Sequence, residues 1–112
     1  MTDGAPKAVP RAQVIRPAEL VAYQPGAVVS RVVLRQPAGT VTAFAFDQGQ
    51  GLSEHTTPYD ALAHVLEGEA EITISGTPHR VRGGEAILMP GGQPHALQAV
   101  EGFKMVLTMI RS

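Results

Sequence analysis

From residue 27 onward, glycine and proline turns divide the chain into short segments rich in β-branched and aromatic residues. Segments such as AVVSRVVLRQ (27–36), TVTAFAF (40–46) and FKMVLTMI (103–110) have the composition of strands. Five further segments cover residues 61–67, 70–75, 79–82, 85–90 and 95–100. Short strands at spacings of about 8–12 residues indicate an all-β sandwich or barrel. No helix of about ten or more residues is expected, and residues 47–60 are predicted to form a loop.

Length and breaker residues define the expected domain organisation. The 112 residues are enough for one domain. Residues 1–12 contain Gly4, Pro6 and Pro10 and are predicted to form a flexible N-terminal tail, and residues 13–112 are predicted to form a single barrel domain. A chain of this length buries only about two-thirds of its unfolded surface, so a partner subunit would help its stability. Gly68 and Gly76 are expected to provide positive φ angles in tight hairpin turns.

Charge and composition argue against several kinds of partner. The net charge is -1 and no basic stripe is present, so no nucleic-acid partner is expected. No apolar run approaches the roughly 18 residues of a membrane span, and no secretory signal is visible. Cysteine is absent, which excludes disulfides, thiol catalysis and thiolate metal ligands. By elimination, the expected location is cytoplasmic.

Residues 84–95, GEAILMPGGQPH, contain the most specific motif of the chain. Gly84, Pro90, Gly92 and His95 match in register the pattern G-x5-P-x-G-x2-H-x3-N, which is the second motif of the cupin family. Ala99 stands at the position of the final asparagine. Because four fixed positions agree in register, this part of the chain resembles a small single-domain cupin.

The first cupin motif, G-x5-H-x-H-x3,4-E-x6-G, is matched only in part. Gly49, His55 and Gly68 fit it, but Thr57 replaces the second histidine and Ala61 replaces the glutamate. The two motifs together span residues 49–99, and the strands on either side also suit the family.

The resemblance implies a jelly-roll barrel (a double-stranded β-helix) of two antiparallel sheets, commonly dimeric. Together with the size of the chain, it predicts a homodimer. In metal-binding cupins, three histidines and one glutamate meet inside the barrel and suit Mn, Fe, Ni, Cu or Zn. Here only His55 and His95 stand at ligand positions, and two imidazoles hold a divalent metal weakly because three or four protein ligands are usual. His55 and His95 are therefore predicted to line a pocket, with or without a weakly held metal. The alternative is a pair of buried histidines satisfied by their neighbours.

Strand alternation decides what is expected of the other polar candidates. Residues i and i+2 share a side of a strand, so His64 lies with Leu62 and Leu66, away from the barrel interior if the family register holds. Asp60 is one residue out of phase with the missing glutamate, and a one-residue slip reverses the side. His79 is expected to be a solvated residue at a sheet edge.

Apolar residues on the same sides of their strands predict a cavity near the two histidines. Phe44 and Phe46 share one side, and Ala61 and Ala63 are small residues on another strand. Met89, directly before a proline, is expected near the barrel mouth. The alternative is ordinary core packing. With two apolar residues of the last strand added, the predicted ligand-binding residues are His55, Thr57, Ala61, His95, Phe44, Phe46, Met89, Met105 and Leu107.

Three functions remain open from the sequence. The first is binding of a small organic ligand in the barrel interior, beside a degenerate two-histidine metal site. The second is a divalent-metal-dependent enzyme of dioxygenase, isomerase or lyase type that uses His55 and His95. The third is a metal-free acid/base isomerase in which one histidine moves a proton. Thr57 and Ala61 favour the first over the second, and the third lacks a visible carboxylate to orient its histidine.

Overall fold

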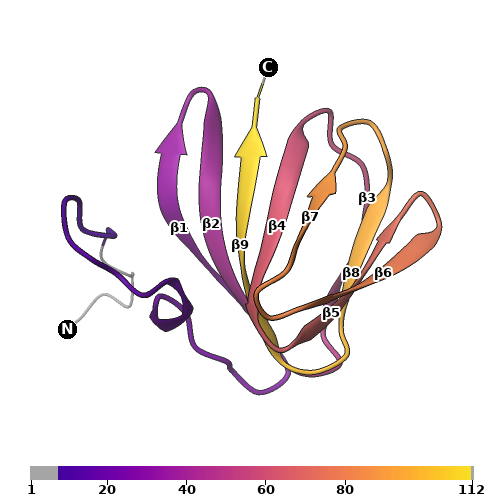
Figure 1. The fold of residues 1–112 in the computed structure, drawn as a ribbon, viewed down its shortest axis with the longest axis horizontal. Helices are drawn as coiled ribbons and strands as arrows, with labels where there is room; N and C mark the ends of the chain where they lie inside the picture. Colours follow the sequence, from indigo (N-terminus) through magenta and orange to yellow (C-terminus); the bar gives the residue numbers. More distant parts are fainter. Residues whose placement is uncertain (1–7, 112) are drawn as a thin grey trace.

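The computed structural model describes residues 8–111; residues 1–7 and 112 lie outside the described part. Within it, nine strands follow a 3-10 helix, η1 (Pro17–Glu19). The strands are β1 (Val28–Gln36), β2 (Gly39–Phe46), β3 (Gly51–His55), β4 (Asp60–Glu67), β5 (Glu69–Ile74), β6 (Thr77–Arg82), β7 (Ala86–Met89), β8 (His95–Ala99) and β9 (Phe103–Ile110). They form a five-stranded sheet of order β1-β2-β9-β4-β7 and a four-stranded sheet of order β3-β8-β5-β6 (Figure 1).

The predicted all-β jelly roll of two antiparallel sheets is therefore confirmed. No helix among the described residues is long and apolar enough to span a membrane. The predicted loop over residues 47–60 is wrong in part, because β3 (Gly51–His55) lies inside it and pairs with β8. The five residues GLSEH are mostly exposed and carry no strand alternation. Their pairing depends on a strand that lies about 45 residues later in the chain, which a local pattern does not reveal.

The segment that precedes β1 covers part of the outer side of the five-stranded sheet. Val21 packs there with Ala43 and Ala45 of β2, and all three are buried. Lys104 Nζ on β9 also donates a 2.6 Å hydrogen bond to the Ala18 carbonyl. Of the predicted tail 1–12, residues 1–7 fall outside the described part, and residues 8–12 carry no strand. The division of the chain at residue 12 stays a prediction.

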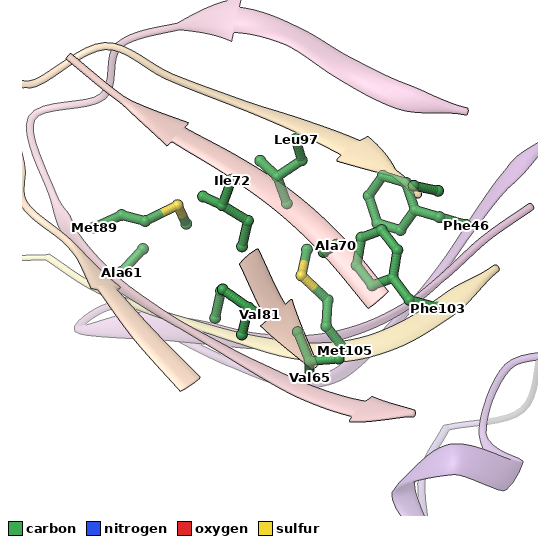
Figure 2. Close-up of a cluster of buried hydrophobic side chains, with 12 residues drawn as sticks. Phe46, Ala61, Val65, Ala70, Ile72, Val81, Met89, Leu97, Phe103 and Met105 are labelled. Carbon is green, nitrogen blue, oxygen red and sulfur yellow. The ribbon is translucent and has the colours of Figure 1, made fainter. Parts of the chain in front are cut away.

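The main core lies between the two sheets and is closed at one end. Phe46 and Phe103 stack with ring centroids 4.4 Å apart and are fully buried. Figure 2 shows this pair at one end of the cluster, with Met89 and Ala61 at the other. Burial of each phenylalanine stabilises the fold by roughly 1.5–3 kcal/mol. The strands converge at the lower end of Figure 1 and splay at the upper end, where β9 finishes.

Two glycines have the expected positive φ angle but serve different connections. Gly76 (φ 82°) follows Ser75 (φ 48°) in the two-residue turn between β5 and β6, as a type I′ hairpin requires. Gly68 also has φ 82°, but its expected hairpin is wrong, because β4 and β5 belong to different sheets. At this crossing a Cβ would collide with the Gly102 carbonyl oxygen and with Phe103. Gly68 is therefore needed for close backbone approach as well as for its φ angle.

Candidate functional site at the open end of the barrel

His55 and His95 lie side by side where β3 ends and β8 begins. The two residues are register partners, and their ring centroids are 4.3 Å apart in an edge-to-face arrangement with an interplanar angle of 66°. His95 shares its side of β8 with Leu97 and Ala99, which belong to the main core. It is only 6% exposed, whereas His55 is exposed. The sequence prediction that these two residues form a pair agrees with this arrangement.

An irregularity in β3 aligns His55 with His95. Leu52 pairs with Leu97 and packs against the core, and strict alternation from Leu52 would bring Glu54 to the inner side. The register of the β3–β8 pair shifts between Leu52 and His55. Because a bulge changes which side a following residue occupies, the shift brings the imidazole of His55, in place of the Glu54 carboxylate, beside His95.

Both imidazoles are oriented by the same kind of local hydrogen bond. His55 Nδ1 lies 2.8 Å from the Ser53 carbonyl oxygen, and His95 Nδ1 lies 3.3 Å from the Gln93 carbonyl oxygen. A carbonyl oxygen only accepts, so each Nδ1 carries the hydrogen and donates it. In the neutral ring, the distal nitrogen Nε2 is then left as an acceptor. Burial lowers the pKa of His95, and the neighbouring His55 lowers it further, against the opposing effect of the Gln93 hydrogen bond. This favours the neutral form of His95.

Thr57 and Ala61, which stand where metal-binding cupins have ligands, have other roles. Thr57 Oγ1 donates to the Tyr59 carbonyl oxygen at 3.3 Å. The Thr57 carbonyl oxygen accepts a 2.7 Å hydrogen bond from the Gly92 amide. Ala61 is buried and is the register partner of Met89 on β7. These contacts connect the segment after β3 to the loop after β7, next to the histidine pair.

The predicted apolar residues divide into two groups by depth. Phe46, Met89 and Met105 are buried in the main core, which favours ordinary packing for these side chains. Phe44 and Leu107 are only partly buried against the same core, and so is Met109. Along β9, burial thus falls from Phe103 towards the end of the strand. Leu107 and Met109 therefore lie on the inner side of the sheet towards its open end, whereas Phe44, the register partner of Met105, lies beside Phe46 near the closed end.

Two apolar residues near the histidine pair, Ile74 and Leu52, were missing from the predicted ligand-binding residues; they are called the wall residues below, together with Phe44 and Leu107. Ile74 is the register partner of His95 across β5 and β8, and Leu52 lies on β3; both pack partly buried against the core. The alternation in AEITI, where Ala70 and Ile72 are buried, could have identified Ile74. Leu52 carried no comparable signal, because β3 lacks alternation.

The remaining polar candidates do not join the histidine pair in a ligand cluster among the described residues. His64 is exposed on β4, where the inner side is taken by Ala61, Ala63 and Val65, so it faces outward as expected. Asp60 is exposed, and its Oδ1 accepts a 2.8 Å hydrogen bond from the Gly91 amide. His79 is exposed on β6, which is the last strand of its sheet, as predicted for an edge residue.

The donor set does not fit a resident transition metal. Two Nε2 atoms are available, but within residues 8–111 no group of three or more His, Cys, Asp or Glu side chains is placed to hold an ion. Thr57 offers only a hydroxyl, which already donates to a carbonyl oxygen, and Ala61 offers no ligand atom. Since three or four protein ligands are usual, this pair is one or two ligands short of a complete set.

Fold and sequence together define a jelly-roll barrel of the cupin class. The domain family described as Cupin domain matches residues 43–111. The match covers more than half of the chain, and it includes β4, β9 and both histidines. The chain belongs to the cupin family.

Solved structures give the same family. A conserved protein of unknown function from Streptococcus pyogenes is 36% identical with a TM-score of 0.89, and the match covers 95% of this chain and 93% of that one. A cupin 2 conserved barrel domain protein from Leptotrichia buccalis is 38% identical with a TM-score of 0.81. That match covers 84% of this chain and 46% of the other, so this chain spans less than half of that protein. KdgF from a Halomonas species is 23% identical with a TM-score of 0.69, and the match covers 82% of this chain and 86% of that one. At this identity, the similarity shows the fold alone. No curated protein gives a significant match.

Proposed function

We propose that this cupin binds a small organic molecule at the open end of its barrel without a resident metal. The observation that carries the proposal is the histidine pair itself: two imidazoles 4.3 Å apart, each with Nδ1 engaged by a backbone carbonyl and Nε2 left available. Partly buried apolar side chains lie on the same inner side, including Phe44, Leu52 and Leu107. Apolar side chains beside a few convergent polar groups are typical of small-molecule sites.

The two enzymatic alternatives have less support. A divalent-metal enzyme would depend on His55 and His95 alone, because Thr57 and Ala61 do not supply the remaining ligands. A metal-free isomerase would need a base whose orientation and charge are supported, commonly by a carboxylate. Here the Nδ1 atoms of both histidines are held by neutral carbonyl groups instead.

The first experiment is metal analysis combined with fragment binding. Tag-free protein, purified without nickel columns, is assayed by elemental mass spectrometry before and after incubation with Mn, Fe, Ni, Cu or Zn. Neutral aromatic fragments are then screened by ligand-observed NMR. We expect no stoichiometric metal, and fragment binding that weakens in His55→Ala and His95→Ala but persists in the matched control His64→Ala. Near-stoichiometric metal that disappears in both site variants would overturn the metal-free proposal. If none of the fragments binds at millimolar concentration, the proposal of small-molecule binding is wrong.

We also propose that the partner of the barrel is a second copy of itself. One row of outward-facing register partners crosses all five strands of the larger sheet, and it consists of Leu34, Val41, Thr108, Leu62 and Leu88. At one end of this row, Leu62 and Leu88 are 42% and 59% exposed. At the other end lies an apolar depression of about 260 Å³ that includes the first three residues of the row.

This arrangement is self-complementary about a twofold axis that runs parallel to β9, the central strand of the sheet, and just outside its outer side. Such an axis brings the protruding leucines of one copy over the depression of the other, as an isologous interface requires. The test is light scattering at micromolar concentration, where a monomer has a mass of 11.8 kDa. We expect twice that mass for the unmodified protein and for Val14→Asp, which alters a fully exposed residue. Leu88→Asp should give the monomer, and a monomeric unmodified protein would overturn the proposal.

A further inference from the structure

The hydrogen-bonding pattern of the histidine pair limits the chemistry of what binds there. Both Nδ1 atoms are used as donors to carbonyl oxygens of their own chain, at Ser53 and Gln93. Among the described residues, neither Nε2 has a hydrogen-bond partner. A neutral imidazole has one donor and one acceptor nitrogen, so the site presents two acceptors and no donor from these rings.

The surroundings of the pair favour an uncharged occupant. His95 is the one polar or charged residue that is buried among residues 8–111, so no buried Lys, Arg, Asp or Glu is present to pair with a charged ligand. Transfer of an ionised group into such a site costs free energy that no counter-charge offsets.

The apolar neighbours determine what the rest of the occupant is like. Ile74 lies directly opposite His95 on β5, and Leu52 precedes the irregularity in β3. Both are partly buried, as are Phe44 and Leu107 of the facing sheet. Apolar surface placed against these side chains is removed from water, so binding is favoured for a molecule with an apolar body.

Resting on the proposed function, we infer that the ligand is a neutral hydroxylated molecule, an alcohol or a phenol. Its hydroxyl group donates a hydrogen bond to Nε2 of the histidine pair, and its apolar body packs against the partly buried wall residues. A carboxylate is excluded by this pattern, because it offers only acceptors to a pair of acceptors. An ammonium group is excluded by the absence of a buried counter-charge.

A series of similarly sized probes tests this inference on the full chain. Phenol carries a neutral donor, fluorobenzene has a similar size without the donor, and benzoate and benzylammonium carry opposite charges. Dissociation constants are measured at pH 7.5 by ligand-observed NMR for the unmodified protein, for His95→Leu, for His55→Phe and for the outward control His64→Ala. Thermal melting of each variant shows whether it has folded, and the exposed residue His55 provides a second variant if His95→Leu is unstable.

We expect phenol to bind more tightly than fluorobenzene by roughly two- to tenfold, the net effect of one neutral hydrogen bond. This preference should shrink towards unity in His95→Leu or His55→Phe, which each remove an acceptor, and persist in His64→Ala. Equal binding of phenol and fluorobenzene, unchanged by the variants, would overturn the inference while leaving the proposed function intact. Tightest binding of benzoate or of benzylammonium would likewise overturn it. Binding of none of the four probes would count against the proposed function itself.

Discussion

Gly68 and Gly76 form a natural pair for separating two reasons why a position requires glycine. Both have φ 82°, so alanine at either position adopts the left-handed region, at a cost of about 1–2 kcal/mol. Beyond the backbone cost, the two sites differ. A Cβ at Gly76 would meet no heavy atom within 4 Å, whereas a Cβ at Gly68 would collide with the Gly102 carbonyl oxygen and with Phe103.

The expected stabilities follow from this difference. Gly76→Ala should lower the free energy of unfolding by about 1–2 kcal/mol. Gly68→Ala should lower the free energy of unfolding by about 1–3 kcal/mol more, because the connection between β4 and β5 must move away from β9. Urea denaturation followed by circular dichroism, at one protein concentration for all samples, measures both values through the transition midpoint and slope. Equal losses in the two variants would refute the steric argument for Gly68 and leave only its φ angle.

Two further predictions concern the candidate site. The pKa of His95 is lowered in the folded state, so the unfolded chain takes up its proton first as the pH falls below the ordinary value of 6.5. The stability associated with neutral His95 is therefore present above that pH and is lost as the pH falls through the pKa of the folded state. Urea midpoints measured between pH 7.5 and 5 should decrease less in His95→Gln than in the unmodified protein. Parallel decreases in the two proteins would contradict this assignment. Restoring the missing ligands in a Thr57→His, Ala61→Glu variant should create a Ni²⁺ site. Nickel at about 100 times its dissociation constant would then stabilise the variant by roughly 2.7 kcal/mol in thermal melting, and an equal effect on the unmodified protein would show that two histidines suffice.

Much of the barrel could be predicted from local patterns. Alternation along residues 61–67 identified the buried alanines and the outward position of His64, because successive side chains of a strand point to opposite sides whatever the strand pairs with. The motif over residues 84–95 identified His95, which the structure places on the inner side of β8. The glycines at positions 68 and 76 indicated positive φ angles. This signal is also local, because it depends only on the absence of a Cβ in glycine.

Other features of the site depend on contacts between distant parts of the chain. The strand β3 was predicted as loop, and only its pairing with β8 explains why His55 rather than Glu54 lies beside His95. The same pairing brings the two rings to 4.3 Å, while the register across all five strands aligns the outer leucines in one row. Side-chain alternation is determined by the covalent geometry of each strand, and so the sequence by itself decided which residues face inward within it. Register, bulges and the crossing between sheets minimise the free energy of the whole barrel, and so only the tertiary structure decided which inward residues meet.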